Sequence, residues 1–353
     1  MSILFAILLF SFLIFVHELG HFVAAKLSGV QVNEFSMFMG PAIFKKQHGE
    51  TLYSIRCIPI GGYCAMEGED ADTDNPRSFQ KAAWWKRLII LVAGAAMNFV
   101  VGVLIMMIVY APAKQVGTPV IDRFEQWSTV QGVEGLQPGD RFLEIDGEKV
   151  YVSGDVSMIL SLNPGNVHDV VVQRNGEKVV LNDFEMLRHP VDNGDGTSSM
   201  LYGFTFRAED ATALSKLEYA WDASINTVRT VRLSLQMLLT GQAGLKDMSG
   251  PVGIVQIMSD TAESSPTTMD AVMNMLYFGG FIAINLAVMN LLPIPALDGG
   301  RVVGLLLTTA AEKLTGKKID PKYEGYLHSA GMILLLALMA IIMFKDIFVI
   351  FKG

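Results

Sequence analysis

Four long apolar runs dominate the pattern of hydrophobic and polar positions in this chain. The first begins at Ser2 and continues without a charge to Val16, residues 88–109 hold 22 uncharged residues, residues 271–297 hold 27, and residues 329–344 hold 16. Each run is close to the roughly 20 residues that a helix needs to cross a bilayer. The pattern therefore predicts a polytopic α-helical membrane protein with four transmembrane helices, over about residues 2–25, 87–110, 272–292 and 327–350.

The segments between these runs have a different periodicity. Residues 50–66 alternate polar and apolar side chains in places and contain Pro59 and Gly61-Gly62. This pattern favours a β-hairpin, associated with the membrane part, over about residues 34–66. Residues 113–190 hold short apolar strands, separated by pairs such as Asp146-Gly147 and Asn175-Gly176. Because these pairs are strong hairpin signals, we expect a β-rich domain there.

The remaining polar segment, residues 191–270, shows helical periodicity with interspersed charges over residues 210–240. This is typical of an amphipathic helix that lies against a membrane surface or another domain, not of a fifth span. The sequence thus predicts four regions: an N-terminal membrane part (1–112), the β-rich domain (113–190), a linker with the amphipathic helix (191–270) and a C-terminal membrane part (271–353).

Composition and charge narrow the class of protein. The chain is 51% hydrophobic and 18% charged, with a mean hydropathy of +0.39, which is more apolar than an ordinary soluble protein. The net charge is −8, and basic residues form no patch of the kind that binds nucleic acid. We therefore expect the lipid bilayer as a partner, and no nucleic acid.

The distribution of basic residues predicts the orientation. Residues 26–87, between the first two runs, hold eight Lys and Arg, and residues 301–322, between the last two, hold five. Loops rich in Lys and Arg stay in the cytoplasm. Both termini and the β-rich domain are therefore expected on the extracytoplasmic side.

The first run ends in the sequence His17-Glu18-Leu19-Gly20-His21. In a helix, H-E-x-x-H places two imidazoles on one face, where both can bind one Zn²⁺, and the glutamate is placed to act as a general base. The alternative is a signal peptide followed by a chance motif, but the run has neither a basic n-region nor a small-residue cleavage site. The motif within membrane composition indicates hydrolysis inside a bilayer.

A catalytic zinc site needs a third protein ligand, and Asp298 is the candidate. Glu18 lies at the end of the first run, and Asp298 follows the third run directly. Pro293 and Pro295 interrupt the helix just before Asp298, and irregular backbone at membrane depth is tolerated only where it is buried or lines a cavity. Two alternatives stay open: Asp298 as a turn or cap residue, and His328 as the third ligand.

Together with H-E-L-G-H, the sequence N-L-L-P-I-P-A-L-D-G-G at residues 290–300 resembles the site-2 protease family of intramembrane zinc metalloproteases. Within that family, the chain more closely resembles bacterial enzymes of the RseP/RasP type, here with a single external PDZ domain. Further matching segments are the sequences at residues 60–63, 93–98, 135–140 and 250–254. The resemblance covers nearly the whole chain and implies a location in the bacterial cytoplasmic membrane, with the active site toward the cytoplasm.

The resemblance also implies the roles of individual residues. His17, His21 and Asp298 are implied zinc ligands, and Glu18 is the implied base. Asn290 is implied in holding the substrate backbone, Asn98 more weakly so, and helix–helix hydrogen bonding is the alternative for both. Gly61 and Gly62 belong to a hairpin that in relatives is proposed to add a strand to the unwound substrate. A hairpin that only covers the active site is the alternative.

The implied substrates are single-span membrane proteins that an upstream site-1-type protease has already shortened outside. Membrane anti-sigma factors are the leading candidates, followed by signal-peptide remnants. We interpret residues 113–190 as a PDZ-like domain, which either binds extended peptide by strand addition or excludes bulky substrates, and we favour the second. Two rival functions are a membrane zinc carrier or sensor, and a scaffold that binds through its PDZ domain without proteolysis.

Overall fold

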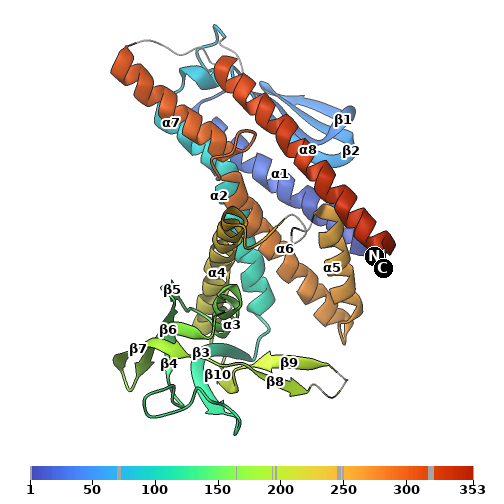
Figure 1. Ribbon diagram of the computed structural model, residues 1–353. Coiled ribbons are helices and arrows are strands. Elements are labelled where there is room, and N and C mark those ends of the chain that lie inside the picture. Colours follow the sequence, from blue (N-terminus) through green and yellow to red (C-terminus); the bar gives the residue numbers. More distant parts are fainter. Residues whose placement is uncertain are drawn as a thin grey trace. The chain divides into compact units, whose positions relative to one another are not determined.

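The structure is a computed structural model that describes residues 2–69, 73–163, 165–192, 194, 197–244, 248, 250–316 and 322–352 (Figure 1). The chain divides into two compact units, one of Met1–Val109 with Thr227–Gly353 and the other of Tyr110–Asn226. Helix α4 (Ala213–Thr240) contributes to both. The first unit also contains α1 (Ser2–Ser28), α2 (Trp84–Tyr110), α5 (Pro251–Glu263), α6 (Thr268–Asn290), α7 (Asp298–Thr315) and α8 (Lys322–Lys352).

Four of the described helices are long and apolar enough to cross a bilayer, in agreement with the apolar runs of the sequence. They are Phe5–Ser28 of α1, Trp84–Tyr110, Thr268–Asn290 and Gly325–Phe348 of α8. The helix α5 and the helix α7 were not predicted. The stretch from Leu291 to Leu297 is not helical, as the prolines there predict.

Small residues bring α1, α2 and α6 close together. A Cβ atom at Gly20 of α1 would lie 2.4 Å from the carbonyl oxygen of Ala93, and one at Gly102 would lie 2.5 Å from Cγ1 of Ile284. Membrane helices gain little from hydrophobic burial against each other, so close backbone approach at small residues is a main source of their packing energy. These contacts bring three chain segments, far apart in sequence, to one site.

The predicted hairpin is formed by β1 (Val32–His48) and β2 (Thr51–Met66), which lie along α1 (Figure 1). Its pairing is more complex than that of a simple hairpin, because one part of β1 is bonded on both edges: Phe35 pairs with both Tyr53 and Cys64. Arg56 stabilises this arrangement of the hairpin by donating hydrogen bonds to the carbonyl of Gly40 at 2.6 Å and to the carboxylate of Glu34 at 2.8 Å. In the described residues, the segment from Gly62 to Met66 has a β partner on one side only.

The turn of the hairpin is tied to the end of α1. Glu50 accepts hydrogen bonds from Lys26 at 2.7 Å and from Arg77 at 2.9 Å. The bonds from Arg77 and Lys26 hold the pKa of Glu50 at about 2, so this carboxylate is charged at any physiological pH. The hairpin is thereby anchored to the same helix that carries H-E-x-x-H.

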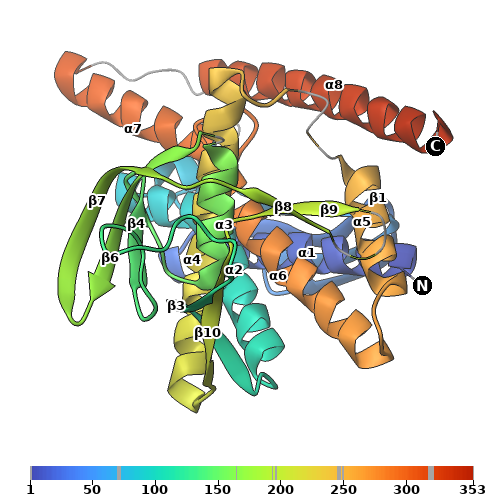
Figure 2. The ribbon, with the colours of Figure 1, turned by 60° about the horizontal axis from the view of Figure 1, so that its bottom comes forward.

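The second unit is built on one antiparallel sheet with strand order β10-β3-β4-β6-β7, in which β5 pairs with β4. Figure 2 shows helix α3 (Ser153–Leu162) beside this sheet. Its residues Val156 and Ile159 are buried in the same hydrophobic core as Phe142 of β4 and Val170 of β6. The strand bounds are β3 Gln115–Phe124, β4 Arg141–Ile145, β5 Glu148–Lys149, β6 Val167–Arg174, β7 Glu177–Glu185, β8 His189–Asp192, β9 Ser198–Leu201 and β10 Phe204–Asp210.

The predicted domain boundary at residue 190 falls inside this unit. Strand β10 pairs with β3 along Phe204 to Asp210, so it belongs to the sheet although it follows the β8–β9 hairpin. The segment predicted as a linker, residues 191–270, therefore supplies an edge strand of the domain. Sequence periodicity could not assign it, because a strand's partner is a long-range property.

A buried ion pair supports this unit. Asp140 is fully buried and accepts hydrogen bonds from Arg174 at 2.7 and 2.8 Å and from the amide of Gln137 at 2.8 Å.

We expect Arg174→Met to destabilise the unit by about 3–5 kcal/mol, because it leaves a buried carboxylate without its cation. Hydrogen exchange of residues 110–226 in the full chain measures this. The matched control Lys178→Met, on exposed β7, should change little, and equal protection in both variants would contradict the prediction.

Candidate metal centre

The H-E-x-x-H sequence lies on α1, as the local pattern predicts. The imidazoles of His17 and His21 converge, with 3.2 Å between their Nε2 atoms and an interplanar angle of 86°. His21 is buried and His17 partly buried. Because residues four apart in a helix share one face, this convergence follows from the sequence alone.

The orientation of His21 depends on α2. Its Nδ1 lies 2.8 Å from the carbonyl oxygen of Ile90, which can only accept a hydrogen bond. Nδ1 therefore carries the proton, and in the neutral ring Nε2 keeps its lone pair. A backbone carbonyl that holds the second nitrogen is the usual support of a metal-binding histidine.

Asp298 reaches the two histidines through the irregular stretch before α7. A Cβ atom at Gly299 would lie 2.3 Å from the carbonyl of Leu291, and one at Gly300 would lie 2.4 Å from the carbonyl oxygen of Ile294. The stretch therefore folds back tightly on the start of α7, and only glycine fits at these two positions. Asp298 is the first residue of α7. It would lie at the end of α6 only if that helix continued through the prolines.

The three side chains form the kind of group that binds a metal ion. Oδ2 of Asp298 lies 3.2 Å from Nε2 of His17 and 3.4 Å from Nε2 of His21, and all three atoms lie within 4.8 Å of one another. Oδ2 is buried and receives no hydrogen bond from the described residues. Tetrahedral zinc with bonds of ~2.0–2.1 Å separates its ligands by ~3.3 Å. The donor set, its spacing and the bare carboxylate oxygen all fit zinc.

Gly94 of α2 forms one wall of this site. A Cβ atom there would lie 2.3 Å from Nε2 of His21 and 2.7 Å from Cε1 of His17. No other residue type leaves room for both rings in their observed positions. Helix α2 therefore contributes the backbone carbonyl of Ile90 and, at Gly94, a position without a side chain.

Glu18 lies beside the hairpin. A Cβ atom at Gly62 would lie 3.5 Å from Cγ of Glu18 and 3.0 Å from the carbonyl oxygen of Ser36. The one-sided strand segment that begins at Gly62 thus runs past the glutamate of the motif. Gly61 has a φ of +80° and is next to Met39 instead.

Comparison with known proteins gives the family. The family model Peptidase family M50 matches residues 5–338. The chain belongs to peptidase family M50. A protein of Clostridium acetobutylicum that bears the name "Putative zinc metalloprotease" is 35% identical over 350 residues, covering 98% of this chain and 97% of its own.

Two further relatives have more specific names. "Zinc metalloprotease RasP" of Oceanobacillus iheyensis is 28% identical over 430 residues, and "Regulator of sigma-W protease RasP" of Bacillus subtilis is 25% identical over 423 residues. Each alignment covers 97% of both chains. This M50 peptidase is thus an intramembrane zinc metalloprotease with Zn²⁺ as its cofactor, as the sequence motifs predict.

The other predicted site residues of this M50 peptidase lie at different distances from the histidines. Asn290, the last residue of α6, has its side-chain nitrogen 3.4 Å from Nδ1 of His17. Asn98 lies one helical turn beyond Gly94 and is buried, and its Oδ1 has no hydrogen-bond partner among the described residues. His328, the alternative ligand, is not part of the metal-binding group.

Sequence reasoning missed two contributions to the site. The carbonyl of Ile90 carries no residue-specific signal, because every residue has one. Gly94 does carry a signal, since a glycine in an apolar span indicates close approach. The sequence shows neither which group approaches it nor that the approaching groups are the two histidines.

Proposed function

We propose that His17, His21 and Asp298 hold the zinc ion of this protease and that Glu18 is its general base. The observation that carries the proposal is the convergence of two Nε2 atoms on a buried carboxylate oxygen that receives no hydrogen bond from the described residues. Zinc held by these residues would polarise the scissile carbonyl and make the attacking water more acidic. Glu18 accepts the proton of that water and later delivers it to the leaving amine.

The hairpin is proposed to present the substrate. A helical substrate hides its amides in i→i−4 hydrogen bonds, so it must be extended before cleavage. The one-sided segment from Gly62 to Met66 offers replacement hydrogen bonds, and its start lies next to Glu18. Gly62 keeps this approach free of a side chain, while Gly61 supplies the positive φ before it.

Asn290 and Asn98 are proposed to act around the same position. The contact of Asn290 with His17 supports a role in orienting that ring, in addition to holding substrate backbone. The unsatisfied Oδ1 of buried Asn98 supports a role in accepting a hydrogen bond in the active state.

We propose that the substrates are single-span membrane proteins already cut outside, with anti-sigma factors first and signal-peptide remnants second. The name of the Bacillus subtilis relative, a regulator of sigma-W, supports the first class. A site-1-type protease would then act upstream. A zinc carrier would need a series of sites, but the described residues contain a single group of metal-ligand type. A non-proteolytic scaffold would not need Glu18.

The proposed location is the bacterial cytoplasmic membrane, with both termini and the second unit outside the cytoplasm. The basic loops support this orientation. The four candidate spans then alternate in direction, and the metal site lies toward the cytoplasmic ends of α1 and α6.

For the second unit, the structure favours a second candidate function beside size exclusion. A cavity of about 380 Å³ lies along β10 and is lined by Val156, Ser157 and Phe204 among others. Strand β10 ends the order of the described sheet, so its outer edge can pair with an extended peptide. We propose that this groove receives the free end of a shortened substrate.

One experiment tests the substrate class and separates the two functions of the second unit. Purified protein is given a single-span substrate with either a folded external domain or a short tail, and cleavage rates are compared. We expect only the short-tailed substrate to be cut. Ser157→Trp should block the groove and slow cleavage if the groove binds the tail, whereas Gly154→Trp, on the same helix facing open space, should not. Equal cleavage of both substrates would contradict the proposal.

A further inference from the structure

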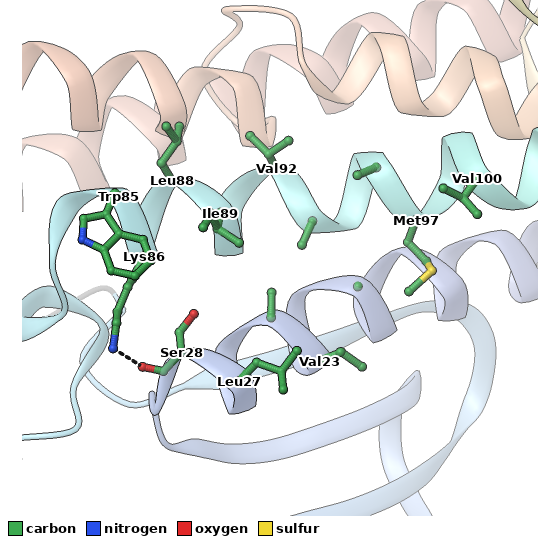
Figure 3. A pocket seen from close by; sticks show the side chains of 14 residues that line it. Val23, Leu27, Ser28, Trp85, Lys86, Leu88, Ile89, Val92, Met97 and Val100 are labelled. Atoms are coloured by element: carbon green, nitrogen blue, oxygen red, sulfur yellow. Dashed lines mark hydrogen bonds between the residues drawn. The ribbon is translucent and has the colours of Figure 1, made fainter.

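A long apolar groove runs between α1 and α2, on the surface of the first unit (Figure 3). Its volume is about 750 Å³, within the ~300–1,000 Å³ typical of sites for small molecules. Its lining includes four small residues of the two helices, Gly20, Ala24, Ala93 and Ala96, beside larger apolar neighbours. The lining is almost wholly apolar.

Both helices that form the groove are membrane spans, so the groove faces lipid and not water. Leu27, Ile89 and Val100 are among its residues and are 84%, 50% and 51% exposed. Water would find too few hydrogen-bond partners there. An occupant of the groove must therefore be apolar along most of its length.

One end of the groove is polar and positively charged. Figure 3 shows Trp85 and Lys86 at the end where α1 finishes with Ser28. Nζ of Lys86 donates to the carbonyl of Ser28 at 3.0 Å and lies 5.7 Å from the centre of the Trp85 ring. In the described part of the chain, no carboxylate pairs with Lys86. Its ammonium group has three donors, so it can still bind an anion.

We propose that this groove is a binding site for one anionic phospholipid, with an acyl chain between α1 and α2 and the phosphate at Lys86. Basic pockets between membrane helices are known to bind anionic headgroups, and Trp and Lys at a helix end lie at headgroup level. A transmembrane helix of a substrate would cover the apolar part of the groove but would bring no anion to Lys86. The charge at the end of the groove therefore favours the lipid.

The site is tested by lipid binding to the purified full-length protein, independently of proteolysis. Phosphatidylglycerol and phosphatidylcholine are titrated in separate samples, and bound lipid is counted by native mass spectrometry. We expect phosphatidylglycerol to bind more tightly, and Lys86→Gln to weaken its binding about fivefold. Lys81→Gln removes the same charge from the segment before α2, outside the groove, and should leave binding unchanged.

A second variant tests the apolar part of the groove. Ala96 is exposed, so Ala96→Leu should fold normally, fill the groove and weaken the binding of both lipids. Equal losses in Lys86→Gln and Lys81→Gln would show attraction by surface charge in general and overturn the proposal. The proposal would also be overturned if Ala96→Leu bound both lipids normally but cleaved a single-span substrate more slowly. That result would show that the groove binds the substrate and not a lipid.

Discussion

Replacement of Glu18 by glutamine is expected to slow peptide-bond cleavage by about 10²–10⁴-fold while the protein keeps its zinc. Glutamine has nearly the same shape as glutamate but cannot accept the proton of the attacking water. The three proposed ligands are other residues, so the metal should stay bound. Cleavage of a tagged single-span substrate, with zinc content determined on the same samples, measures both effects.

The ligand variants provide the matched control. His21→Ala and Asp298→Asn should lose both zinc and activity, because each removes one atom of the group that surrounds the metal position. If Glu18→Gln also loses its zinc, Glu18 is a ligand or a structural residue and the proposed base is wrong. If His21→Ala keeps its zinc, the metal is bound elsewhere.

Replacement of Gly94 by alanine is expected to weaken zinc binding by about 10–100-fold, the range seen when groups that orient metal ligands are changed. The added Cβ would lie 2.3 Å from Nε2 of His21, so the ring must leave its position. The ring cannot move freely, since its Nδ1 is held by the carbonyl of Ile90. Zinc affinity, measured by competition with a chelator, tests this without reference to cleavage.

Gly325 of α8 is the control for this variant. It is also a glycine in a candidate membrane span, but a Cβ atom there meets nothing within 4 Å. Gly325→Ala should therefore bind zinc as the wild type does. Unchanged zinc affinity in Gly94→Ala would show that α2 does not confine the imidazoles, and the wall we describe would have no role in the site.

The sequence by itself determined the features of this protein that depend on neighbouring residues. The four membrane helices follow from uninterrupted apolar runs, because a span needs only its own side chains to be stable in lipid. The pairing of His17 with His21 follows from the period of the helix. The interruption before Asp298 follows from two prolines, each of which removes an amide donor.

Only the tertiary structure decided which distant groups meet. It placed Asp298, at the start of α7, beside His21 of α1, which lies 277 positions earlier in the sequence. It also placed the carbonyl of Ile90 and the side-chain-free position Gly94 next to His21. It also joined β10 to a sheet that sequence periodicity had ended at residue 190, and it paired β1 with β2 on both edges. These contacts have no local signal, because they depend on small residues and backbone groups whose partners are set by the packing of the whole chain.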